Sequence, residues 1–273
     1  YLPMYRGDNW LTHFHGAWGA ECTMEEEKLT NGQKVITNKD GLVNTETDNP
    51  SFMLSLDGKP QEETGKVLGG ILAWSGNYKL KLNVCNTALS IIAGMNEENS
   101  HYILESKEVF KTPEFAMTYS INGKGGVSRT FHRWARQYKM NQGNRPHDIL
   151  LNSWEGVYFK VNQKGMDEMM AAFSAMGGEL FVMDDGWFGH RNNDDSSLGD
   201  WKVNTDKIKG GLKYLVDEVN KIGLEFGIWF EPEMISPDSD LYRAHPDWAI
   251  HIDGRAATQS RCQYVLDLSR KEV

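Results

Sequence analysis

The stretch ELFVMDDGWFG, Glu179–Gly189, decides the fold of the second half of this chain. A short apolar run, Leu180–Met183, stops at two adjacent carboxylates, Asp184 and Asp185, and a glycine-bounded turn follows. This pattern predicts a buried strand of a parallel sheet and the loop after its carboxyl end. Because α/β enzymes place their chemistry at that end, the carboxylates and the two aromatic residues of the loop indicate a pocket for a polyhydroxylated ligand. The alternative is an acidic loop with one core tryptophan.

Strands and helices alternate along residues 147–273. The expected strands are Ile149–Trp154, Leu180–Met183, Leu224–Phe230 and Tyr264–Leu268, and the expected helices are Gly165–Met176, Lys207–Ile222 and Pro237–His245. This alternation predicts an α/β sheet or a (β/α)8 barrel. A complete barrel needs about 250 residues, roughly twice this segment. The expectation is therefore either a small open sheet or a truncated barrel of about four βα units.

Residues 1–122 show a different pattern of short extended segments broken by turns. In Tyr78–Val84 the side chains of Tyr78, Leu80, Leu82 and Val84 alternate onto one face, as in a half-buried strand. Several such segments predict a β-sandwich. An amphipathic helix over Val127–Met140, with Ser128 as a possible cap, then leads into a polar segment. We expect a sandwich domain over residues 1–122, a linker helix over 123–146 and the barrel part over 147–273.

Composition excludes several function classes. The formal net charge of −9 argues against binding of nucleic acid, and no apolar run approaches the roughly 20 residues that span a membrane. The first residues lack an initiator Met and a signal-like core, so we expect the chain to start inside a longer protein. Three scattered cysteines suit a reducing cytoplasm. No P-loop, G-x-G-x-x-G or H-E-x-x-H is present, and we expect no cofactor and no metal.

Polar and aromatic residues gather where the expected strands end, or just before the last one: Trp154, Asp184, Asp185, Trp229 and Arg261. Such convergence is typical of a site at the carboxyl edge of a sheet. Retaining glycoside hydrolysis needs two carboxyl groups about 5–5.5 Å apart across the anomeric carbon. Adjacent Asp side chains diverge, so this pair suits two neighbouring hydroxyls better than the nucleophile and acid roles. A structural and a functional role suit Glu231 and Glu233 equally.

At these residues the chain resembles the α-galactosidases of glycoside hydrolase family 36. The stretches that carry the resemblance are NSWE (Asn152–Glu155), ELFVMDDGWFGHR (Glu179–Arg191), SSLGDW (Ser196–Trp201), FGIWFEPEMISPDSDLYRAHPDW (Phe226–Trp248) and VLDLSR (Val265–Arg270). The upstream half resembles the family's N-terminal β-sandwich through HGAWGAEC (His15–Cys22), WSGNY (Trp74–Tyr78) and the SRTFHRW helix.

The resemblance implies a retaining α-galactosidase that acts on melibiose- or raffinose-type galactosides by double displacement, commonly as a homotetramer. It implies a β-sandwich packed on a (β/α)8 barrel. It also implies the following site: Asp184 and Asp185 on the galactose 4- and 6-hydroxyls, Trp154 and Trp229 as walls of the sugar subsite, Arg261 near the nucleophile, and Trp18 over the pocket mouth.

The family's nucleophile belongs to a Lys-x-Asp motif on the strand after VLDLSR, and its acid/base Asp lies on a later strand. The resemblance therefore places both catalytic groups beyond Val273, and we expect the 273-residue chain alone to be inactive. Two alternatives stay open: a non-catalytic carbohydrate-binding protein, and a galactosyl transferase on the same scaffold. A metal site at Asp184, Asp185 and Glu231 ranks lower, since flanking Trp residues suit a sugar better than a hydrated cation.

Overall fold

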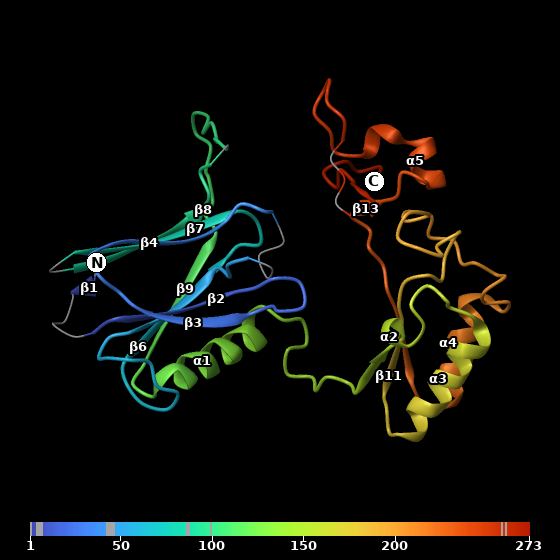
Figure 1. Ribbon diagram of the computed structural model, residues 1–273, viewed down its shortest axis with the longest axis horizontal. Coiled ribbons are helices and arrows are strands. Elements are labelled where there is room, and N and C mark those ends of the chain that lie inside the picture. Colours follow the sequence, from blue (N-terminus) through green and yellow to red (C-terminus); the bar gives the residue numbers. More distant parts are fainter. Residues whose placement is uncertain are drawn as a thin grey trace. The chain divides into compact units, whose positions relative to one another are not determined.

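The computed structural model divides into two compact units, Tyr1–Arg145 and Pro146–Val273, each of which is described by itself (Figure 1). The structure describes residues 2–3, 8–41, 47–85, 88–98, 100–257, 259 and 261–273. The boundary between the units falls in the polar segment that follows the first long helix. That helix packs against the strands of the first unit and belongs with them.

Two antiparallel sheets build the first unit, with strand orders β1-β8-β7-β4 and β3-β2-β5-β6-β9. The strands are β1 (Leu2–Pro3), β2 (Trp10–His15), β3 (Thr23–Lys28), β4 (Gly32–Asn38), β5 (Ser51–Ser55), β6 (Val67–Ala73), β7 (Tyr78–Cys85), β8 (Ala88–Met95) and β9 (Glu114–Ser120).

Apolar side chains of both sheets form one core. On β7 the alternation is as predicted, with Tyr78, Leu80 and Leu82 fully buried. They pack in the same cluster as Leu11 and Leu54 of the other sheet. Because the inner faces of both sheets share this core, the first unit is a β-sandwich, as the sequence predicts.

Helix α1 (Gly123–Tyr138) covers the outer face of the second sheet. It begins four residues before the expected Val127, so Ser128 lies inside the helix and the prediction that it caps the helix was wrong. A contact from outside the helix accompanies the early start, because the amide of Lys124 donates to the carbonyl of Gln61. On β6, Gly69 lets the helix approach closely: a Cβ there would lie 2.4 Å from Cγ1 of Val127.

Three parallel strands form the main sheet of the second unit, in the order β10 (Leu150–Asn152), β11 (Leu180–Met183), β12 (Glu225–Ile228). β11 has the predicted bounds. The helices of this unit are α2 (Trp154–Val157), α3 (Gln163–Ala175), α4 (Gly211–Lys221), α5 (Asp240–Ala244) and the 3-10 helix η1 (Pro246–Trp248). Met166 and Met170 of α3 and Leu215 of α4 are buried in the core with β11.

Some predicted boundaries in this unit were wrong. The first strand ends at Asn152, and Trp154 opens α2. Met176, the expected last residue of the helix over Gly165–Met176, lies past the last turn of α3 and is 76% exposed. α4 starts at Gly211, four residues after the expected Lys207, and the backbone of Gly211 is left-handed, with φ of 67°.

The expected fourth strand does not join the parallel sheet that the described residues form. β14 (Tyr264–Val265) instead pairs antiparallel with β13 (Met234–Ile235), which follows β12 closely. A short apolar run does not indicate which strand it will pair with or in which direction. β14 pairs with β13, which is closer to it in the sequence than β12.

Candidate active site

The carboxyl ends of β10, β11 and β12 lie side by side. The parallel register pairs Asn152 with Val182 and Met183 with Ile228, so the three strands end at the same edge. Asp184 and Asp185 directly follow β11, and Trp229 directly follows β12. This edge is where an open parallel sheet or a barrel holds its ligand.

Asp184 is half-buried and fixed by its neighbours. The side-chain amide of Asn152 donates to Oδ2 at 2.5 Å, and the backbone amide of Asp185 donates to Oδ1 at 2.7 Å. The amide of Asp184 itself donates to Oγ of Ser153 at 3.0 Å. Because a carboxylate has about four acceptor sites, two remain for hydroxyl donors of a ligand.

Asp185 has a different environment, since it is 5% exposed and paired with the fully buried Arg191. Nε of Arg191 donates to Oδ1 at 3.0 Å, and Nη2 donates to Oδ2 at 2.8 Å. Arg191 also donates to the carbonyls of Asp194 and Ser196 and to the carboxylate of Asp194. The two adjacent aspartates are therefore not equivalent, because one anchors the loop through an arginine and the other has free acceptor capacity.

Lys207, which follows this loop in the sequence, also holds it through backbone carbonyls. Its Nζ donates to the carbonyls of Gly186 at 2.7 Å, Arg191 at 2.8 Å and Phe159 at 3.2 Å. Burial lowers the pKa of Lys207, and the nearby charge of Asp185 acts in the opposite direction. Sequence reasoning missed both Arg191 and Lys207. Arg191 stands six residues after Asp185 in a glycine-rich loop, which is a usable signal, whereas Lys207 gave none.

The aromatic residues of this region divide into core and edge. Trp187 and Phe188 are at most 1% exposed, so the prediction that the aromatics of this loop line a pocket was wrong for them. Nε1 of Trp187 donates to the carbonyl of Trp229 at 3.2 Å. Trp229 is half-buried and lies edge-on to Trp201, with ring centroids 6.2 Å apart. Half-buried Trp154 lies edge-on to two neighbouring aromatic rings.

Arg261 comes to this edge from the segment before β14. Its Nη2 donates to Oε1 of Glu231, two residues past Trp229. The backbone of Arg261 is left-handed, with φ of 53°. Burial raises the pKa of Glu231 above its ordinary range, and the charge of Arg261 partly offsets that rise.

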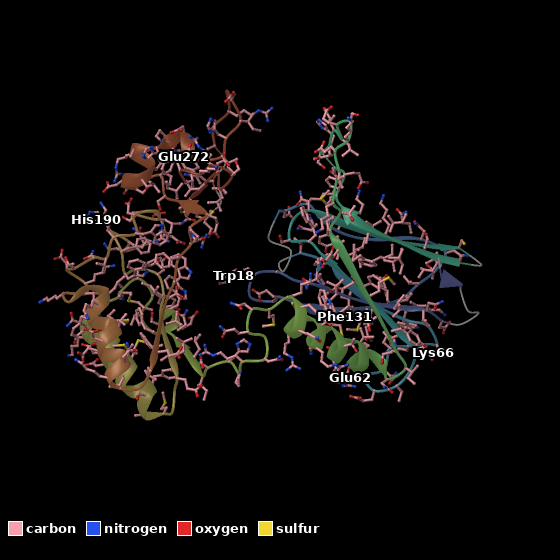
Figure 2. All side chains as sticks on the ribbon, turned by 180° about the vertical axis from the view of Figure 1, so that it is seen from behind. Trp18, Glu62, Lys66, Phe131, His190 and Glu272 are labelled. Atoms are coloured by element: carbon pink, nitrogen blue, oxygen red, sulfur yellow. The ribbon has the colours of Figure 1, made fainter. Side chains whose placement is uncertain are left out.

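Trp18 lies in the first unit, in the turn between β2 and β3, where it is labelled in Figure 2. It is 86% exposed. The expectation that it reaches over the pocket mouth stays a prediction.

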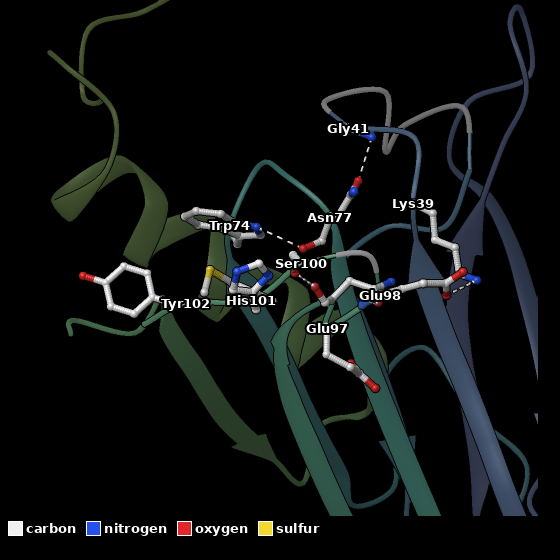
Figure 3. Close-up of a pocket in the computed structure, with 11 residues that line it drawn as sticks. Lys39, Gly41, Trp74, Asn77, Glu97, Glu98, Ser100, His101 and Tyr102 are labelled. Carbon is white, nitrogen blue, oxygen red and sulfur yellow. Dashed lines mark hydrogen bonds and ion pairs between the residues drawn. The ribbon is translucent and has the colours of Figure 1, made fainter. Parts of the chain in front are cut away.

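The sandwich unit has a hollow of its own, of about 780 Å³, lined by Trp74, Tyr102 and polar groups (Figure 3). Its charged groups are already paired: Glu97 with Lys79 at 2.6 Å, and Glu98 with Lys39. We place the candidate site at the strand ends of the second unit instead, because buried and partly buried charges gather there. Across the described residues, no group of three His, Cys, Asp or Glu side chains is arranged to hold a metal ion.

Comparison with known proteins decides the family. Residues 109–273 match the family model described as Melibiase. The chain belongs to the melibiase family. Residues 1–105 match the model of the N-terminal domain of glycosyl hydrolase family 36. The resemblance stated from the sequence motifs is therefore confirmed, and so is the fold class, a β-sandwich followed by the first part of a catalytic barrel.

Several relatives of this melibiase chain are named α-galactosidases. AgaA of Geobacillus stearothermophilus is 38% identical over 97% of the chain, and Mel36A of Lactobacillus acidophilus is 40% identical over 94%. The chain spans about a third of the length of these relatives, 36% and 35%. A crystal structure of an AgaA variant in complex with stachyose superposes with a TM-score of 0.92 at 38% identity, covering 99% of this chain and 38% of the other.

In the part of the chain that the structure describes, no helix has the length and apolarity required to cross a bilayer.

Proposed function

We propose that the protein containing this chain is a retaining α-galactosidase that hydrolyses terminal α-galactosides of the melibiose and raffinose type by double displacement. Membership of the melibiase family supports this proposal, as do relatives named α-galactosidase. Crystal structures of AgaA variants hold stachyose and raffinose. The proposal extends the substrate class of those relatives to this chain.

One observation carries the proposal: a loop at the carboxyl edge of a parallel sheet holds one carboxylate with free acceptor capacity next to one that an arginine anchors. The free acceptor sites of Asp184 suit recognition of sugar hydroxyls, and the family assigns a second hydroxyl to the anchored Asp185. Asp184 and Asp185 would bind the galactose 4- and 6-hydroxyls. The remaining assignments follow the family: Trp154 and Trp229 as walls of the subsite, Arg261 near the nucleophile and Trp18 over the mouth.

The two aspartates cannot perform the hydrolysis themselves, since retention needs two carboxyl groups that flank the anomeric carbon. The nucleophile and the acid/base would come from other strands of the complete barrel. The chemistry of this chain is then to bind and orient the sugar, which is worth several kcal/mol of the barrier when the geometry is held rigidly.

The test is an assay of the complete gene product and of the 273-residue chain with a chromogenic α-galactoside and with melibiose. The complete product should hydrolyse both, and NMR should detect α-galactose as the first anomer released. The 273-residue chain should show no turnover. Release of β-galactose first, or turnover by the short chain, would contradict the proposal.

We further propose that the complete protein is a cytoplasmic homotetramer. The first unit exposes Ile103, Leu104 and Val109 by 55–88%, apolar surface that an assembly would cover. All three cysteines are thiols, as suits a reducing compartment. Light scattering on the purified gene product measures the assembly: a mass of one or two chains would contradict the tetramer.

A further inference from the structure

Glu231 places a carboxylate in a poorly solvated position just past β12. Its side chain is 15% exposed, and Oε2 is buried without a hydrogen-bond partner among the residues that the structure describes. A buried charge is unfavourable unless a partner compensates it. The position of this carboxylate therefore depends on the cation that contacts it in the described part of the chain.

That cation is Arg261, thirty residues further along the chain. Both the hydrogen bond and the ion pair that the structure gives its guanidinium go to Oε1 of Glu231. The Arg261 side chain is 52% exposed, and its backbone is left-handed, a conformation that residues with a Cβ rarely adopt. Neither burial nor local backbone preference fixes the guanidinium, so the contact with Glu231 fixes it.

The pair belongs to one charge cluster with the aspartate loop. Burial raises the pKa of Glu231; Arg261 and Arg191 lower it, whereas the charges of Glu233 and Asp185 raise it further. A carboxyl with a raised folded pKa stabilises the fold below its ordinary pKa of 4.5 and loses that contribution as pH rises through the folded pKa. Ionised Glu231 is thus unfavourable for stability, which points to a role other than bracing the fold.

We propose that Glu231 is a positioning residue whose ionised carboxylate holds the Arg261 guanidinium at the sugar-binding edge of the sheet. The inference rests on the proposed α-galactosidase function and deepens it, because it assigns a second carboxylate system to the same site. Protonated Glu231 is neutral and releases the guanidinium, so sugar binding weakens as pH falls.

Kinetics of the complete gene product test this role with Glu231→Gln, which keeps the shape and removes the charge. KM for melibiose should rise about tenfold, while kcat changes less than threefold. In the unchanged protein KM should rise as pH falls through the folded pKa of Glu231, above 4.5, whereas in E231Q it should be high at every pH. Glu231→Asp should restore part of the loss, and Glu168→Gln, at an exposed position of α3, should change nothing.

Two further readouts separate this inference from the proposed function. E231Q should melt no lower than the unchanged protein at neutral pH, whereas a bracing residue would lower the melting temperature. The ¹⁵N signals of the Arg261 guanidinium should be sharp and distinct in the unchanged protein and averaged in E231Q. If no α-galactoside is hydrolysed but these NMR signals respond, the proposed function fails and the contact stands. Unchanged KM, pH profile and NMR signals in E231Q would overturn the inference.

Discussion

Two ion pairs of similar length have opposite surroundings in the two units. In the sandwich, Nζ of Lys28 lies 2.6 Å from Asp8, and both side chains are at least half exposed. In the barrel unit, Nη2 of Arg191 lies 2.8 Å from Asp185, and the side chains are 0% and 6% exposed. Water screens the first pair and makes it nearly neutral in stability, whereas the second has lost its hydration and depends on its partner. The same chemistry is thus a surface detail in one unit and a structural constraint in the other.

Of the changes considered, Arg191→Met should have the largest effect on the free energy of unfolding. It leaves the carboxylate of Asp185 buried and unpaired, so the free energy of unfolding should fall by about 3–5 kcal/mol. Lys28→Met, the matched change in the exposed pair, should cost about 0–1 kcal/mol. Urea unfolding followed by tryptophan fluorescence measures both. Equal losses in the two variants would mean that burial does not distinguish the pairs.

A double variant sharpens the same comparison. Replacing both partners, Asp185→Leu with Arg191→Met, removes the unpaired charge and should recover most of the stability. Activity should not return, since the proposed sugar-binding carboxylate is gone. Recovery of activity would show that the pair serves the fold alone.

Asp184→Asn in the complete gene product tests the half-buried neighbour of that pair. The loss of a charged acceptor for sugar hydroxyls should lower kcat/KM on melibiose about 100-fold, equivalent to about 2.7 kcal/mol. The fold should be retained, because the loop stays anchored through Asp185. Asp217→Asn, at an exposed position of α4, is the control and should leave kcat/KM unchanged. Unaltered kinetics in D184N would show that Asp184 does not bind the sugar.

Tyr78→Phe tests an uncharged buried hydrogen bond of the sandwich unit. Tyr78 is fully buried, and its hydroxyl donates to the carbonyl of Asp48 at 2.5 Å. Removal of the hydroxyl leaves this carbonyl without its partner, so the unfolding free energy should fall by about 1–2 kcal/mol. Tyr119→Phe, at a position 53% exposed, should have almost no effect. A loss below about 0.5 kcal/mol in Y78F would mean that water replaces the hydroxyl.

Most element types, and the strand that carries the aspartates, could be predicted from local pattern. The alternation in β7 and the apolar run of β11 are properties of neighbouring residues, and the structure confirms both. Element ends were less predictable, as at α1, because contacts from outside the element decide where a helix begins. For the same reason the direction of β14 was missed: its partner is chosen in three dimensions.

The sequence by itself determined the two-part architecture, the loop with Asp184 and Asp185, and the resemblance to family 36, because these depend on short-range periodicity and contiguous motifs. Only the tertiary structure decided that Arg191 anchors Asp185, that Lys207 binds three carbonyls of the surrounding loops, and that Glu231 meets Arg261. The contacts of Lys207 and of Glu231 join residues from separate segments, and the Asp185–Arg191 pair, although it lies within one loop, depends on lost hydration. Burial is a property of the folded chain, so a local sequence pattern does not predict which charges pair in a buried position.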